Sequence, residues 1–269
     1  MSSLESFWRP LGHTGLRVSP LGFGTVKLGR DQGVKYPDQF QIPDDRQAAQ
    51  LLALAQDLGI NLLDTAPAYG RSEERLGQLL RGQRDQWVIV SKVGEEFEQG
   101  QSHFDFSAQH TRYSVERSLK RLNTDRLELV LVHSDGRDLE ILEQTEVYPT
   151  LEALKREGKI LAYGFSGKTP AGGLRALERG DCVMLTYNLN EQQEVVVIEQ
   201  AARQGKAVLI KKALASGHAC LDTTDDPVRR SWELLLRQPG ISSIIVGTIN
   251  PQHLRENVAQ ALAVLEQQI

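Results

Sequence analysis

One pattern recurs along the chain: an amphipathic helical stretch, a glycine, and then a short, almost continuous run of apolar residues. The glycines at these junctions are Gly59, Gly158, Gly180, Gly205 and Gly240. Glycine tolerates the left-handed backbone conformation in which many helices end. Unbroken apolar runs are typical of strands that are buried on both faces of a parallel sheet. The repetition therefore predicts alternating helices and parallel strands.

The number of these units predicts the architecture. Eight segments fit strands: 21–25, 60–64, 87–91, 128–132, 160–165, 182–187, 207–211 and 243–246. Each is followed by a helical stretch, the last over about 251–265, and eight βα units predict a closed barrel. An open doubly wound sheet is the alternative, but its dinucleotide fingerprint is missing, because Gly22-Phe-Gly24 continues into Thr-Val-Lys. Residues 8–20 have hairpin character. We therefore expect one (β/α)8 TIM-barrel domain over residues 1–269, with an N-terminal β-hairpin.

Charge and composition exclude several classes of protein. The 31 Lys and Arg residues against 35 Asp and Glu residues give a net charge of −4, which argues against a nucleic-acid or membrane partner. No apolar run approaches the ~20 residues of a spanning helix, and the first residues lack the features of a signal peptide. The two cysteines, Cys182 and Cys220, rule out a disulfide framework. We expect a cytoplasmic protein.

Three predicted strands end in titratable residues, namely Asp64, Lys92 and His133, and Tyr69 follows five residues after Asp64. Active sites of such barrels lie at the carboxyl ends of the strands, and these three strands are neighbours. Each residue alone has an ordinary structural role: the aspartate as a helix cap, the lysine as a solvated charge, the histidine as a structural hydrogen-bonding group. Their convergence predicts an active site.

The chemistry of these four residues fits a proton donor for a carbonyl group. A phenol has a pKa near 10 in water, and a neighbouring ammonium lowers it. Asp64 is placed to anchor Lys92 by an ion pair, and His133 to hydrogen-bond the substrate oxygen or share the proton. With no cysteine and no dense carboxylate cluster at these positions, we expect no metal.

The segment Asp64-Thr-Ala-Pro-Ala-Tyr-Gly-Arg-Ser-Glu-Glu-Arg-Leu-Gly77 resembles the hallmark segment of the aldo-keto reductases. Further segments follow in the family's order: Val90-Ser-Lys92, Ser114 to Asp125, Leu131-Val-His133, Gly158-Lys-Ile, Gly164-Phe-Ser166 and Leu254 to Asn257. The resemblance runs from about residue 10 to residue 260. It implies a barrel that binds a nicotinamide cofactor without a Rossmann domain and reduces aldehydes or ketones, or oxidises alcohols, by hydride transfer. It also implies Tyr69 as general acid, Lys92 and Asp64 as its tuning pair, and His133 as the partner of the substrate oxygen.

For the cofactor, the resemblance implies contacts from a set of residues spread over the strand ends. These are Gly24, Thr25, Ser166, Lys211, Gly247, Thr248, Asn250, His253 and Asn257. Ser166 matches the serine that hydrogen-bonds the nicotinamide carboxamide. Residues 247–257 match the adenosine-phosphate loop and the helix after it, where Thr248 and the helix N-terminus are expected to bind phosphate. The family suggests NADP(H). NAD(H) is the alternative, because positions 250 and 253 hold Asn and His where the family often has an arginine.

Three positions depart from the family pattern. Gly167 stands where the family has Asn, Met184 where it has Gln, and Lys211 where an aromatic ring stacks on the nicotinamide. We hypothesise that the Lys211 ammonium repels the cationic oxidised nicotinamide; the alternative is that it swings away to a phosphate or a carboxylate.

The favoured interpretation is that the protein is an NADP(H)-dependent carbonyl reductase, of the alcohol:NADP⁺ oxidoreductase type, that acts on a small-molecule carbonyl. A cofactor-binding redox sensor or accessory subunit with little turnover is the alternative. A Schiff-base lyase that uses Lys92 leaves Tyr69 unexplained. The sequence indicates neither the substrate nor the oligomeric state. The loop aromatics Tyr36, Phe40, Phe104 and Phe106 are expected either to wall the pocket or to pack the loops down.

Overall fold

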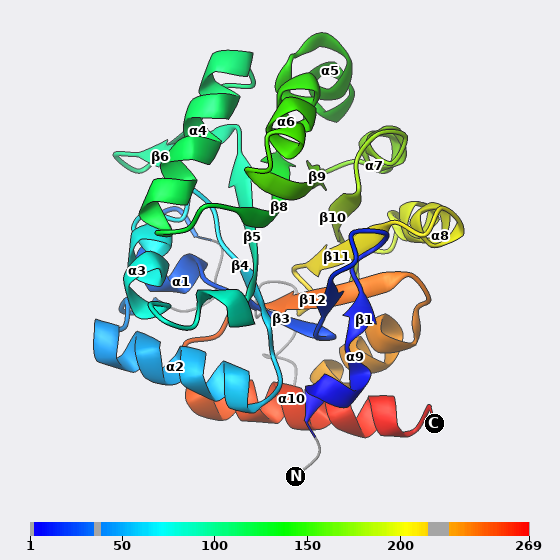
Figure 1. Ribbon diagram of the computed structural model, residues 1–269. Helices are drawn as coiled ribbons and strands as arrows, with labels where there is room; N and C mark the ends of the chain where they lie inside the picture. Colours follow the sequence, from blue (N-terminus) through cyan, green and yellow to red (C-terminus); the bar gives the residue numbers. More distant parts are fainter. Residues whose placement is uncertain (1–2, 35–38, 215–225, 269) are drawn as a thin grey trace.

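The eight predicted strands form a closed parallel barrel. The computed structural model describes residues 3–34, 39–214 and 226–268. Around the ring the strands are β10 (Cys182–Thr186), β11 (Ala207–Lys211), β12 (Ile241–Val246), β3 (Leu21–Gly24), β4 (Leu62–Asp64), β5 (Val88–Val93), β8 (Leu127–His133) and β9 (Ile160–Ser166). Every pair of neighbours is parallel (Figure 1). The expected (β/α)8 TIM barrel is confirmed, and the open sheet is excluded.

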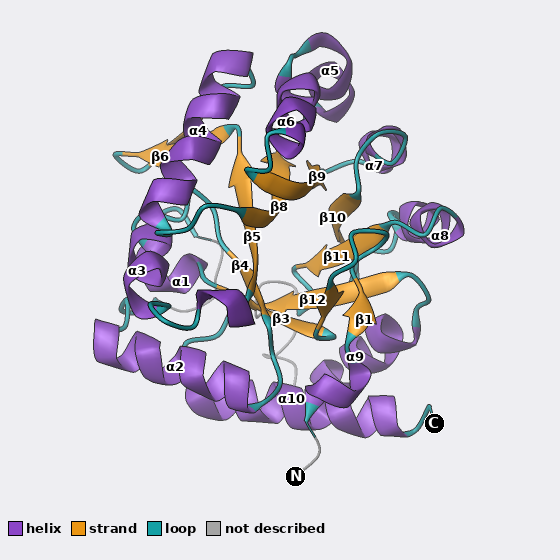
Figure 2. Cartoon of the chain, in the orientation of Figure 1, coloured by secondary structure: helices purple, strands orange, loops and turns teal. Residues whose placement is uncertain are grey.

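Helices surround the strands on the outside, as the purple ring around the orange strands in Figure 2 shows. They include α2 (Asp45–Asp57), α3 (Ser72–Leu79), α4 (Ala108–Arg121), α6 (Val147–Arg156), α7 (Pro170–Ala176), α8 (Val195–Arg203), α9 (Pro227–Arg237) and α10 (Pro251–Glu266). Asp44 starts α2 with a capping box, in which its carboxylate accepts from the Gln47 backbone and the Gln47 side chain accepts from the Asp44 backbone.

Two short hairpins lie outside the barrel strands. The N-terminal hairpin pairs β1 (Arg9–Pro10) with β2 (Arg17–Val18), as expected. The second pairs β6 (Glu95–Glu98) with β7 (Gln101–Phe104) in the loop after β5. It was not predicted, because its residues are mostly polar and lack an apolar alternation. The remaining short elements are η1 (Leu4–Phe7), α1 (Val26–Gly29), η2 (Arg84–Gln86) and α5 (Asp138–Gln144).

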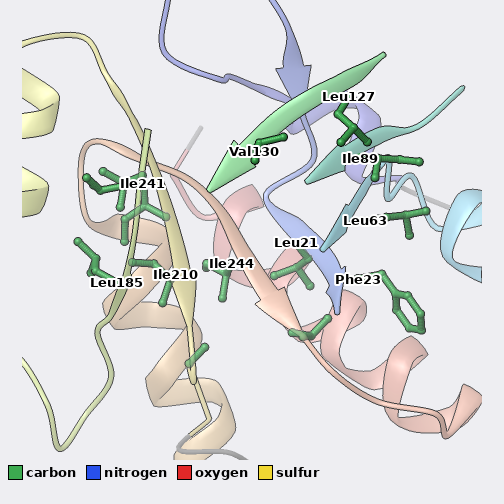
Figure 3. Packing of buried hydrophobic residues seen from close by; sticks show 14 of the residues in the cluster. Leu21, Phe23, Leu63, Ile89, Leu127, Val130, Leu185, Ile210, Ile241 and Ile244 are labelled. Atoms are coloured by element: carbon green, nitrogen blue, oxygen red, sulfur yellow. The ribbon is translucent and has the colours of Figure 1, made fainter. Parts of the chain in front are cut away.

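Successive strand residues face opposite sides, which produces two apolar layers. Leu62 and Leu129 point into the barrel, where they belong to the interior cluster. Leu63 belongs to the layer between strands and helices. Figure 3 shows Leu21 and Ile244, paired residues of β3 and β12, in that outer layer. Because the barrel strands are buried on both faces over most of their length, their sequences are nearly continuous apolar runs, and this is why the strands could be identified from the sequence.

The junction glycines mostly behave as the sequence predicts. Gly59, Gly158, Gly205 and Gly240 have φ angles of 82°, 76°, 63° and 94°, in the region that favours glycine. Gly180 has no positive φ. A Cβ atom there would lie 2.9 Å from the Tyr148 hydroxyl oxygen, so its glycine is required by a close approach and not by a left-handed turn.

Candidate active site

The four predicted catalytic residues lie together at the carboxyl ends of β4, β5 and β8. Lys92 Nζ donates hydrogen bonds to Asp64 Oδ1 at 2.5 Å and to the Thr65 carbonyl oxygen at 2.9 Å. The Tyr69 hydroxyl lies 3.3 Å from Asp64 Oδ2, to which it donates. Lys92 Nζ is 4.6 Å from the centre of the Tyr69 ring. The Tyr69 and His133 rings meet edge to face at 6.5 Å.

The strand register explains this convergence. Asp64 pairs with Val90, two residues before Lys92, and His133 pairs with Ser166 on β9. The side chains of Asp64, Lys92 and His133 therefore lie at nearly the same level along the barrel axis, at the carboxyl ends of their strands. Tyr69 is carried by a tight turn in which its backbone N–H donates to the Ala66 carbonyl at 3.0 Å.

Thr25, an expected cofactor contact, has a structural role, because its hydroxyl bonds other parts of the site. Its hydroxyl donates to the Asp64 carbonyl oxygen at 2.9 Å and accepts from the Ser72 hydroxyl at 2.7 Å. The Thr65 hydroxyl lies 3.1 Å from the same Ser72 oxygen. This chain of buried hydroxyls ties the end of β4 to α3, and thereby holds the backbone that carries Asp64.

Burial makes the Lys92–Asp64 pair a strong local constraint. Only 1% of the Lys92 side chain and 6% of the Asp64 side chain are exposed. A buried charge that loses its partner is costly, so each residue of such a pair holds the other in place.

Glu95, a residue that sequence reasoning missed, faces His133. Glu95 Oε2 lies 2.7 Å from His133 Nδ1, and Glu95 Oε1 accepts from the Ser102 hydroxyl at 2.6 Å. Burial alone would raise the pKa of Glu95, but His133, Ser102 and Arg30 outweigh it and lower the pKa to about 2. Glu95 belongs to the β6–β7 hairpin. No local sequence signal marks it, because its partner is 38 positions away.

The Lys211 side chain extends from β11 across β10 to the end of β9. Its Nζ donates to the Ser166 hydroxyl oxygen at 2.9 Å and to the Gly167 carbonyl oxygen at 2.7 Å. The lysine therefore does not stand free over the cavity, and it forms no direct ion pair with a carboxylate of the described residues. Burial lowers the pKa of Lys211 to about 8.

Glu194 is a second acidic residue that the sequence did not reveal. Its Oε2 accepts from the Thr186 backbone N–H at 2.9 Å, while its Oε1 is buried and has no hydrogen-bond partner among the residues that the structure describes. Burial raises the pKa of Glu194, and the charge of Lys211 opposes that rise. An unpaired buried acceptor beside a cavity is a group that a bound ligand can satisfy.

A cavity of about 1030 Å³ opens over three of the four residues, and the fourth, Lys92, lies buried behind its wall. Asp64, Tyr69 and His133 line it, as do the expected cofactor residues Gly24, Lys211, Gly247, Thr248, His253 and Asn257. Of the described residues expected to touch a cofactor, Thr25, Ser166 and Asn250 are not part of the lining. The volume is at the upper end for small-molecule sites.

The start of α10 is capped by the protein itself. Asn250 Oδ1 accepts from the Gln252 backbone N–H at 2.8 Å and from the His253 N–H at 3.4 Å. The Thr248 hydroxyl oxygen accepts from the Asn250 N–H at 3.1 Å. Some donors expected to bind phosphate thus already have partners.

The cavity nevertheless suits a phosphate-bearing ligand. Lys27, Lys168 and Lys212 join Lys211 in its lining, and the ammonium group is a common phosphate binder. Together with the unpaired Glu194 oxygen, this set of donors and acceptors fits an elongated polar cofactor.

The loop aromatics divide between two places. Phe40 lines the cavity. Phe104 and Phe106 stack at 6.2 Å and line a separate hollow beside α5, which favours loop packing for this pair. Tyr36 lies outside the described residues, as does Cys220; Cys182 is buried as a free thiol.

Over residues 3–34, 39–214 and 226–268, no group of three or more His, Cys, Asp or Glu side chains could hold a metal ion. In the same part of the chain, no helix has the length and apolar character needed to cross a membrane.

Comparisons with known proteins agree with this geometry. The model of the Aldo/keto reductase family matches residues 20–233. A crystal structure of a Pseudomonas aeruginosa protein assigned to the aldo-keto reductases is 68% identical over 98% of this chain and 97% of its own, with a TM-score of 0.90. The holo form of aldo-keto reductase AKR11C1 from Bacillus halodurans is 26% identical over 94% of this chain and 90% of its own, with a TM-score of 0.78. The uncharacterized oxidoreductase YqkF of Bacillus subtilis is 26% identical over 95% of this chain and 91% of its own.

Proposed function

The chain belongs to the aldo/keto reductase family, an NAD(P)H-dependent oxidoreductase family, and from this premise we propose that it reduces an aldehyde or ketone with NADP(H) as cofactor and Tyr69 as general acid. The observation that carries the proposal is the contact chain Lys92–Asp64–Tyr69 at the wall of the cavity. A bound nicotinamide supplies the hydride, and the protein's own residues supply the proton and its control.

Tyr69 is the residue assigned to deliver the proton. Its hydroxyl turns from Asp64 Oδ2 to the carbonyl oxygen and donates its proton as negative charge develops there. The charged Lys92, 4.6 Å from the ring centre, stabilises the phenolate that remains. Asp64 holds the Lys92 ammonium in position through their 2.5 Å contact.

For the cofactor, we assign Gly24, Lys211, Gly247, Thr248, His253 and Asn257 as contacts, because they line the cavity. Ser166 acts indirectly, because its hydroxyl oxygen accepts a hydrogen bond from Lys211 and so fixes the position of the ammonium group. Thr25 and Asn250 act indirectly, the first by holding the backbone of Asp64 and the second by capping α10.

The experiment is Tyr69→Phe, which removes one oxygen and leaves the ring in place. We expect kcat for NADPH oxidation with a panel of aldehydes to fall about 10²–10⁴-fold, while NADPH affinity, measured by titration of reduced-nicotinamide fluorescence, stays within about two-fold. Tyr113→Phe is the control, because Tyr113 is 55% exposed on α4. Near-normal turnover in Tyr69→Phe would refute the assignment. Parallel titrations with NADH test the cofactor preference.

A second candidate is a redox sensor or accessory subunit that binds the cofactor with little turnover. The Lys211–Ser166 contact favours it, because the hydroxyl expected to hold the carboxamide already has a protein partner. Tight NADPH binding with no turnover across the panel would select this candidate over the reductase.

A further inference from the structure

Arg30 follows α1 and lies against the turn that carries Tyr69. Only 11% of its side chain is exposed. Its Nη1 donates to the carbonyl oxygen of Ala68, the residue before Tyr69, at 3.0 Å. Its Nε and Nη2 donate to the carbonyl oxygens of Gln32 and Gly33 at 2.8 and 3.2 Å. All three guanidinium nitrogens thus have acceptors, which fixes the orientation of the group beside the turn.

The backbone around this contact is also tightly packed. The Gly29 carbonyl oxygen accepts from the Arg71 backbone N–H at 3.3 Å. A Cβ atom on Gly29 would overlap the Tyr69 carbonyl oxygen, and a Cβ atom on Gly70 would overlap the Gly29 carbonyl oxygen. The end of α1 therefore lies directly against the turn, and the two segments are fixed relative to one another.

The same guanidinium group contacts the β6–β7 hairpin. Arg30 Cζ lies 3.3 Å from the centre of the Phe97 ring, and Arg30 Nη1 lies 3.9 Å from Glu95 Oε1. A planar guanidinium can stack on an aromatic ring while it donates several hydrogen bonds, whereas a lysine ammonium is a point charge without a flat face. These contacts together therefore require an arginine and not only a positive charge.

The charge of Arg30 acts on Tyr69. Burial lowers the pKa of Arg30, while electrostatic attraction to Glu95 and to Tyr69 raises it, and arginine remains protonated in proteins. Attraction between two groups is mutual, so a positive charge at Arg30 favours the phenolate form of Tyr69.

Three other titratable groups meet Tyr69. Asp64 Oδ2 accepts from its hydroxyl at 3.3 Å, Lys92 Nζ lies 4.6 Å from its ring centre, and the His133 ring packs against it at 6.5 Å. A charged Asp64 opposes the phenolate, Lys92 favours it, and His133 favours it only when protonated. Arg30 adds a permanent positive charge from a further element, the end of α1.

We propose that Arg30 is a positioning residue for the reaction: it holds the turn that carries Tyr69 through the Ala68 carbonyl, and its charge stabilises the phenolate that remains when Tyr69 has given its proton to the substrate oxygen. The role in catalysis rests on the proposed function. The effect of Arg30 on the Tyr69 phenol does not, because it needs neither cofactor nor substrate.

The phenol is followed directly by ¹³C NMR of protein labelled at the tyrosine ring carbon that bears the hydroxyl, without cofactor or substrate. Tyr69→Phe identifies the Tyr69 resonance. In Arg30→Met, which keeps a long side chain and removes the charge, we expect this resonance to titrate at higher pH than in wild type. Arg30→Lys keeps the charge and should titrate close to wild type. Arg112→Met, the same loss of charge at a position on α4 that is 38% exposed, should leave the titration unchanged.

Steady-state kinetics test the positioning role. We expect kcat for NADPH-dependent carbonyl reduction to fall roughly ten-fold in both Arg30→Met and Arg30→Lys, because neither side chain can bond the Ala68 carbonyl and stack on Phe97 together. The NADPH dissociation constant should stay within about two-fold of wild type. The lysine variant thus separates charge from geometry, because it should keep the titration and lose turnover.

A Tyr69 titration that is the same in Arg30→Met and in wild type overturns the proposal, and so does a wild-type kcat in both variants. If Arg30→Met fails to fold, Arg30→Gln, which keeps a donor and lacks the charge, is titrated in its place and decides in the same way. Absence of turnover in the wild-type protein would count against the proposed function, while the NMR titration would still decide whether Arg30 acts on Tyr69.

Discussion

The buried Lys92–Asp64 pair allows a quantitative test of the site. At 2.5 Å separation and an effective dielectric constant of about 20, two unit charges attract by roughly 6–7 kcal/mol, and desolvation offsets part of this. Removing one partner leaves the other charge buried and uncompensated, which costs about 3–5 kcal/mol. We therefore expect Lys92→Met to lower the free energy of unfolding by that amount and Tm by roughly 5–9 °C for a chain of this length.

A double-mutant cycle separates the pair from ordinary packing loss. Lys92→Met, Asp64→Asn and the double variant are compared with wild type by urea unfolding followed by circular dichroism. We expect the double variant to be more stable than the sum of the single effects predicts, by roughly 1–3 kcal/mol, because it leaves no lone charge. Lys159→Met is the matched control, since the Lys159–Glu116 pair is about one-third exposed and should contribute no more than about 1 kcal/mol. A loss below about 1 kcal/mol in Lys92→Met, or strict additivity, would refute the argument.

Three further predictions follow from individual contacts. If the Lys211 ammonium disfavours oxidised nicotinamide, Lys211→Tyr and Lys211→Met should both lower the ratio of the NADP⁺ dissociation constant to the NADPH dissociation constant several-fold. The wild-type ratio should also fall between pH 7 and 9 as Lys211, with a pKa of about 8, loses its proton. Titrations that give the same ratio for all three proteins contradict this. A Cβ atom on Gly164 would lie 1.9 Å from a backbone carbonyl oxygen of β10, so Gly164→Ala should lower Tm by several degrees. A thermal scan that matches wild type would show that β9 and β10 can move apart without loss of stability. The pKa of Glu95 falls from 4.5 to about 2 on folding, so the ionised carboxylate stabilises the fold above about pH 4.5, and this contribution is lost as the pH falls towards 2. The difference in free energy of unfolding between wild type and Glu95→Gln should therefore shrink over that interval. A difference that does not change with pH would argue against an ionised Glu95.

The barrel, and the convergence of the four residues predicted to be catalytic at its carboxyl end, were predictable because both depend on short-range order. Strands buried on both faces are continuous apolar runs, and the residue that ends each run lies at the carboxyl end of the barrel whatever the rest of the chain does. Asp64, Lys92 and His133 each end such a run, and Tyr69 follows in a turn. The structure then shows the Lys92–Asp64 contact that this placement implies.

The partners of these residues were decided by the tertiary structure. Glu95 reaches His133 only because the loop after β5 folds into a hairpin beside β8, and a polar segment carries no periodic signal for that fold. The sequence shows that Lys211 replaces an aromatic residue, but not that its ammonium crosses β10 to Ser166. A long side chain has many rotamers of similar energy, and the acceptors within its reach select among them once the strands are in register. Local apolar pattern thus determined where the site lies, while packing between distant segments determined which atoms face each other inside it.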